Sequence, residues 1–247
     1  MWDRLRAAAA RHAPGGLWSP LPPGPGCCAV CRGQAGPGFR GCFQCSLHQQ
    51  HAPGLLADLV VPVSYAVAGT DYARLLWQYK SDVPQRDAAR ALLRALLLAF
   101  LHDHGPCVRA RAGIAGRPHV AVVPTGRGRP GSHPLRTLVE PYLALPWAEL
   151  AIDPAEPVQP RDLRPGRFRP AARLADAAVL LLDDTWTSGA SAQSAAIALR
   201  LAGASRVAVI TLGRHVNPRD RAADSLTAAA GARSFWPDVC AVHGPAG

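Results

Sequence analysis

The feature that most constrains this chain is an apolar run that ends in two acids. Val179–Asp183 is predicted to be a buried strand because its first residues are uninterrupted Val and Leu, and a second acid, Asp184, follows at once. Ala190–Ala202 has the composition of a helix that Gly203 can end. Ionised acids at the end of a buried strand need partners. The segment therefore predicts a strand, a ligand-binding turn and a helix in close succession.

The turn has the features of a monophosphate site. Helix N-terminal amides and the helix dipole favour an anion, and Gly189 permits close backbone approach. The adjacent carboxylates can accept hydrogen bonds from two ribose hydroxyls. An ordinary strand-to-helix turn accounts for one capping hydroxyl but not for two acids. The predicted phosphoribosyl-binding residues are Asp183, Asp184, Thr185, Thr187, Ser188, Gly189, Ala190 and Ser191.

Other segments alternate between strand and helix patterns. Leu59–Ala66, His119–Pro124 and Arg206–Leu212 are rich in β-branched residues and are predicted strands. Arg86–His104 has apolar residues at helical spacing and is a predicted amphipathic helix. Continuous apolar strands alternating with helices predict an α/β fold, a Rossmann-like parallel sheet with flanking helices. Ligands of such sheets bind beyond the carboxyl ends of the strands.

The front of the chain carries two CxxC pairs separated by ten residues. Each pair lets two thiolates approach one tetrahedral ion, so a structural zinc site is predicted, with no open position for hydrolysis. Its ligands are Cys28, Cys31, Cys42 and Cys45. Cys27, His48 and His51 stay open as replacement ligands. Cys107 and Cys240 are expected to be separate, ordinary thiols.

Clusters of Pro and Gly mark loops and linkers along the chain. We expect an N-terminal segment or linker (residues 1–26), a zinc-binding module (27–58) and the α/β domain (59–247). The net charge of +10 suits an anionic ligand, although the arginines are scattered and Lys80 is the only lysine. The longest apolar stretch, Ala91–Leu101, contains Arg94 and is too short to cross a bilayer. A cytoplasmic protein without membrane spans is expected.

The acid pair and the following Thr-x-Thr-Ser-Gly-x-Ser resemble the phosphoribosyl-diphosphate motif of type I phosphoribosyltransferases. Two CxxC pairs stand in front, Trp77-Gln-Tyr-Lys80 precedes the long helix, and a strand ends at Val-Val-Pro124. This order is similar to the ComF-type competence-associated family, from Cys28 to Arg214. The resemblance implies the type I phosphoribosyltransferase fold and magnesium bound with phosphoribosyl diphosphate. It assigns the diphosphate to Thr125, Gly126, Arg127 and Lys80.

The chain departs from the family at Gly128-Arg-Pro-Gly-Ser-His133, where the family usually has Arg-Gly-Phe-Asn-Gln. Arg161–Arg169 resembles the family's mobile arginine loop. The resemblance implies a glycosyltransferase that moves phosphoribosyl to an unidentified acceptor. The alternative is a non-catalytic accessory protein of DNA uptake that binds a related nucleotide, single-stranded DNA or competence proteins.

Overall fold

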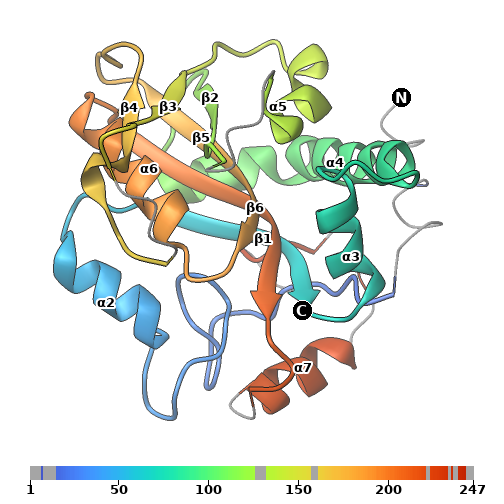
Figure 1. Ribbon diagram of the computed structural model, residues 1–247. Coiled ribbons are helices and arrows are strands. Elements are labelled where there is room, and N and C mark those ends of the chain that lie inside the picture. The colour runs from blue at the N-terminus through green and yellow to red at the C-terminus, as the bar shows by residue number, and fades with distance from the viewer. Residues whose placement is uncertain are drawn as a thin grey trace.

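The computed structural model describes residues 7, 15–125, 132–156, 161–220, 223–232, 235 and 239–242. Its main sheet has four parallel strands in the order β1-β6-β5-β2, with helices on both faces (Figure 1). The strands are β1 (Leu59–Val67), β2 (His119–Val122), β5 (Ala178–Trp186) and β6 (Arg206–Val216). The predicted α/β class and helix-covered parallel sheet are therefore confirmed.

Alternating side chains of the strands enter two separate cores. On β5, Leu180 and Leu182 face the core shared with helices α3 (Asp71–Gln78), α4 (Arg86–Ala112) and α5 (Pro134–Val139). Val179 and Leu181 face the opposite core, which α6 (Ala190–Leu201) covers. Burial on both faces explains why the strand has an unbroken apolar run rather than an alternating one.

The cysteine segment packs directly on the α6 side of the sheet. It ends in α2 (Phe43–His51), and β1 begins at Leu59, next to the predicted boundary. The four cysteines of the CxxC pairs belong to the same buried cluster as Leu181 and Trp186. The segment therefore shares its core with the sheet.

The elements α4, β5 and β6 all continue well past their predicted ends. α4 continues past Pro106 to Ala112, because Val108 and Ala112 are buried in the core, and Gly113 ends it with a left-handed φ of 67°. β5 continues to Trp186 because it stays paired with the equally extended β6. The turn before α6 is therefore shorter than expected.

The connections after β2 and β5 diverge. α5 follows β2 and packs on the α4 side of the sheet, whereas α6 follows β5 and packs on the other side. Adjacent strands whose helices go to opposite faces leave a crevice at their carboxyl ends. The predicted ligand-binding turn lies at this point of the sheet.

Smaller elements complete the structure. The short strands β3 (Leu150–Ile152) and β4 (Phe168–Pro170) form an antiparallel pair. The remaining elements are the 3-10 helices η1 (Glu140–Tyr142) and η2 (Pro165–Arg167) and the helix α7 (Asp224–Gly231). In the described part of the chain, no helix has both the length and the apolar character needed to cross a membrane.

Candidate functional site

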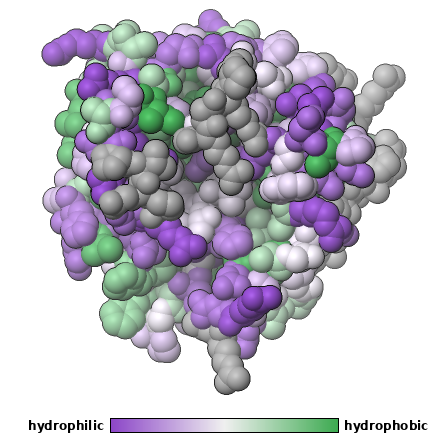
Figure 2. Space-filling view, viewed as in Figure 1, coloured by the Kyte–Doolittle hydropathy of each residue, from purple (hydrophilic) through white to green (hydrophobic). Residues whose placement is uncertain are grey.

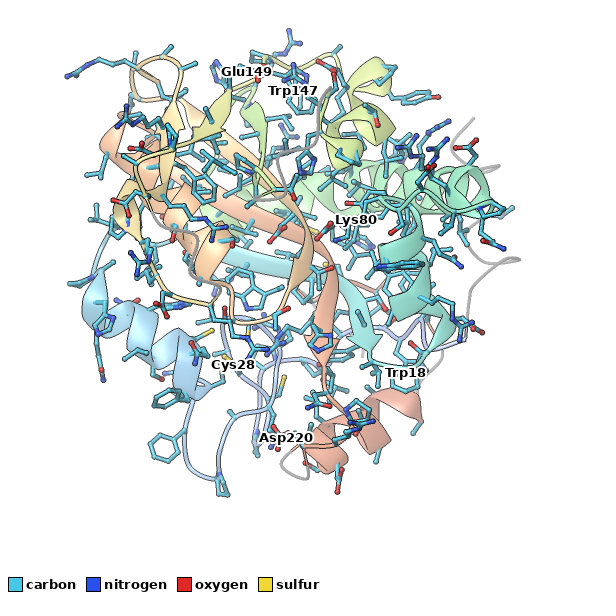
Figure 3. The ribbon with its side chains drawn as sticks, viewed as in Figure 1. Trp18, Cys28, Lys80, Trp147, Glu149 and Asp220 are labelled. Atoms are coloured by element: carbon cyan, nitrogen blue, oxygen red, sulfur yellow. The ribbon has the colours of Figure 1, made fainter. Side chains whose placement is uncertain are left out.

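The two acids at the end of β5 occupy different environments. Asp184 Oδ2 accepts hydrogen bonds from the Tyr79 hydroxyl and from Lys80 Nζ, both at 2.7 Å. Asp183 Oδ1 accepts from the backbone N–H of Asp184 at 2.9 Å. Tyr79 and Lys80 directly follow α3, and Figure 3 labels Lys80 there. Lys80, predicted to bind the diphosphate, thus contacts Asp184, predicted to bind the ribose.

These environments push the two pKa values apart. Burial, and then the negative charge of Asp184, raise the pKa of Asp183 to about 7. For Asp184, burial acts in the same direction, but the charge and hydrogen bonds of Lys80 and Tyr79 outweigh it and hold its pKa below the ordinary value. His133 adds to that lowering. Asp184 is therefore ionised at neutral pH. Asp183 is partly protonated there, and a cation or hydrogen-bond donor that comes close to it would favour loss of its proton.

The turn after β5 depends on Gly189. This residue has a φ of 80°, and a Cβ placed on it would lie 2.1 Å from Trp186 Cζ2. Trp186 is fully buried, so its ring cannot move away easily. The tryptophan thus acts as packing for the turn. α6 begins at Ala190 without a side-chain cap, although Ser188 Oγ accepts from the Ala190 N–H at 3.3 Å.

The predicted arginine loop contacts the start of α6. Arg167 Nη1 donates to Ser191 Oγ at 3.0 Å, and its guanidinium lies 5.2 Å from the centre of the Phe168 ring. The Arg164 backbone N–H donates to Ser194 Oγ at 2.8 Å. Arg167 is buried, and no carboxylate in the described ranges forms an ion pair with it. The loop therefore brings a cation to the positive end of a helix.

The predicted diphosphate residues are only partly described. Thr125 follows β2 and lines a cavity of about 310 Å³ together with His133, Trp147 and Glu149. Arg136, also in its lining, pairs with Glu149 at 2.6 Å and lies 4.6 Å from the Trp147 ring centre (Figure 3). Gly126 and Arg127 lie outside the described residues.

The four cysteines of the CxxC pairs converge on one point beside α2, where Figure 3 labels Cys28. Their sulfur atoms all lie within 4.8 Å of one another, and Cys31 Sγ is 3.8 Å from Cys42 Sγ. A tetrahedral ion with bonds of about 2.3 Å to sulfur places two sulfurs about 3.8 Å apart. The buried cluster could therefore hold a metal ion such as zinc.

The alternative ligands lie outside this cluster. The set of residues whose ligand atoms lie within 4.8 Å of one another does not include Cys27, His48 or His51. His48 is buried, and neither ring nitrogen has a hydrogen-bond partner among the described residues. Burial, followed by the nearby His51, lowers the pKa of His48. A neutral imidazole is thus expected there at neutral pH.

Arg214, on β6, connects the cysteine cluster with the end of β5. It donates to the Trp186 carbonyl at 3.2 Å, and its guanidinium covers Gly33, where a Cβ would lie 2.2 Å from Nη2. Burial acts to lower the pKa of Arg214, but the charges of the clustered cysteines raise it. A buried guanidinium can compensate the negative charge of a four-thiolate metal site.

Several of these partners carry weak sequence signals. Tyr79 lies within the segment noted before the long helix, but nothing in the sequence indicates that its hydroxyl reaches Asp184. Arg214 and His133 have no local motif at all.

Comparison with protein-family models, with curated proteins and with solved structures found no match. The family resemblance therefore stays a hypothesis drawn from the motifs.

Proposed function

We propose that this chain binds phosphoribosyl diphosphate with magnesium at the carboxyl end of β5 and transfers the phosphoribosyl group to an acceptor. The observation that carries the proposal is the buried Arg167 guanidinium, 3.0 Å from Ser191 Oγ at the N-terminus of α6. A cation at the positive end of a helix is unfavourable by itself. A bound phosphate would compensate both charges.

The neighbouring groups suit the rest of such a ligand. The hydroxyls of Thr187, Ser188 and Ser191 and the first amides of α6 would bind the 5-phosphate. Asp183 and Asp184 would accept from the ribose hydroxyls. With these hydroxyls bound to Asp184, Lys80 Nζ, now 2.7 Å from Asp184 Oδ2, would turn to pair with a diphosphate oxygen. A type I phosphoribosyltransferase fold and a cytoplasmic location, where thiols stay reduced, are parts of this proposal.

The proposed reaction is a displacement at the anomeric carbon. A nucleophile of the acceptor forms a bond to that carbon as the bond to the diphosphate oxygen breaks, and diphosphate leaves. Magnesium would neutralise charge on the diphosphate and be held largely by ligand oxygens and water. The protein's contribution is to fix the ribose and phosphate relative to the acceptor, since such chemistry depends on positioning and charge stabilisation.

Isothermal titration of phosphoribosyl diphosphate with magnesium tests the proposal. Wild-type protein should bind saturably, and Asp183→Asn/Asp184→Asn should lose binding. Asp87→Asn is the matched control, because Asp87 is an exposed acid on α4. Absence of binding by folded wild-type protein, or equal binding by the double variant, would sink the proposal.

A second candidate is binding of single-stranded nucleic acid by the cysteine segment. Phe39 and Phe43 are 70% and 76% exposed, and Arg40 beside them is exposed as well. Apolar side chains gather at the lower left of Figure 2, over this segment. Exposed aromatics near a cation are typical of base-stacking surfaces. Salt-dependent binding of a labelled oligonucleotide that falls in Phe39→Ala/Phe43→Ala, and not in Asp184→Asn, would favour this function.

A further inference from the structure

A second group of metal-binding side chains lies away from both sites described above. His104 and Cys107 are three residues apart on α4 and so face the same side of the helix. Cys240 comes from the C-terminal segment. One ligand atom from each residue lies within 4.8 Å of the other two. The expectation of two unrelated thiols is therefore wrong, because packing joins residues that are far apart in sequence.

The spacing of these atoms matches a tetrahedral zinc site. Cys107 Sγ and Cys240 Sγ are 3.7 Å apart, close to the value of about 3.8 Å that two zinc-bound sulfurs adopt. A disulfide would need a separation of about 2.05 Å. His104 and Cys240 are buried, as structural zinc ligands usually are, and one imidazole with two thiolates is a ligand set that zinc prefers.

We propose that His104, Cys107 and Cys240 bind a second zinc ion, which fastens the C-terminal segment to α4. Binding exchanges the two thiol protons for the ion, and the neutral imidazole contributes its free electron pair. Three protein ligands leave one tetrahedral position for a water molecule. Among the residues that the structure describes, no fourth His, Cys, Asp or Glu joins the group.

The neighbouring contacts give this ion a structural role. Arg32 Nη2 donates to the carbonyl of Ala241, the residue after Cys240, at 2.8 Å. Arg32 Nη1 also donates to the Cys28 carbonyl at 3.4 Å. Arg32 is buried and has a positive φ of 60°, a backbone conformation that needs such contacts to persist. The C-terminal segment thus contacts the cysteine segment through Arg32, and the second ion would hold the same segment to α4.

Metal content of the full chain tests the proposal. Native mass spectrometry of zinc-loaded wild-type protein should give two ions per chain, and Cys107→Ser/Cys240→Ser should give one. Cys27→Ser is the matched control, because Cys27 is a buried cysteine outside both groups, and it should keep two. One ion in the wild type, or two in the Cys107/Cys240 variant, would overturn the proposal.

A titration of wild-type protein with cobalt(II) gives the same answer without a variant. Thiolate-to-cobalt absorption should rise in two steps, with a weaker step for the site that has two sulfurs instead of four. A single step that ends at one equivalent would contradict the second site. Neither experiment depends on the proposed phosphoribosyl ligand, so the two proposals fail or stand separately.

Discussion

The cysteine cluster and the acid end of β5 are neighbours in space, yet they are built in opposite ways. All four clustered cysteines come from one short segment, and their sulfurs surround a single buried point. Asp184 instead takes its partners, Tyr79 and Lys80, from a segment about a hundred residues earlier. The cluster is a closed site, whereas the acid end is partly exposed and charged. We therefore expect the first to contribute stability when it holds a metal, and the second to hold charges that a ligand can satisfy.

The largest expected effect comes from breaking the closed site. Cys31→Ser/Cys42→Ser should lose the metal and destabilise the protein by about 5 kcal/mol or more, because metal binding energy in such sites is folding energy. Urea unfolding together with zinc analysis measures this. Cys27→Ser should keep its metal and most of its stability. If the double variant unfolds like the wild type, the cluster does not stabilise the fold.

The contrast also explains what the sequence could predict. The β5 strand, the start of α6 and the cysteine ligands follow local patterns of burial and spacing, and all three are present. Tyr79 on Asp184 and Arg167 on Ser191 depend on how distant segments pack, which no local pattern encodes. The same limit applies to the pairing of Cys107 with Cys240. α4 ran past Pro106 because burial of the following turn outweighed one lost backbone hydrogen bond.

A second prediction concerns the turn that separates the acids from α6. Gly189→Ala should destabilise the protein by about 3 kcal/mol, because the new Cβ meets the buried Trp186 ring in addition to the cost of a positive φ. Gly69→Ala is the matched control: its φ is 94°, but no atom lies within 4 Å of the new Cβ. It should cost only about 1 kcal/mol. Equal losses in urea unfolding would mean that Trp186 does not constrain the turn.

The smallest effect on the free energy of unfolding should come from substitution of Asp183. It should stabilise the protein, whereas substitution of the clustered cysteines should destabilise it. The pKa of Asp183 is about 7 in the folded protein, whereas an unfolded Asp has a value of about 3.9. Between these values the folded state holds a proton that the unfolded state has lost. The free energy of unfolding therefore decreases as the pH rises from about 4 to about 7, and the loss is complete above that range.

Asp183→Asn removes this titration and should keep the hydrogen bond from the Asp184 N–H, since an amide oxygen can accept it. The variant should be more stable than wild type at about pH 8, because it removes a carboxylate that is disfavoured by burial and by the charge of Asp184. The gain should be only about 1 kcal/mol, because the side chain is partly exposed and solvent screens its charge. The difference should shrink towards about pH 4, where both side chains are neutral. Asp87→Asn, the same change of side chain on the exposed surface of α4, is the matched control.

Thermal unfolding across this pH range measures the Asp183 effect. A stabilised Asp183→Asn protein that no longer binds phosphoribosyl diphosphate would mean that the acid is kept for its ligand at a cost in stability. Destabilisation of this variant at about pH 8 would mean the reverse, that Asp183 supports the fold much as the buried cysteines do. The contrast between a closed site that stabilises and an open site that binds would then not hold for Asp183.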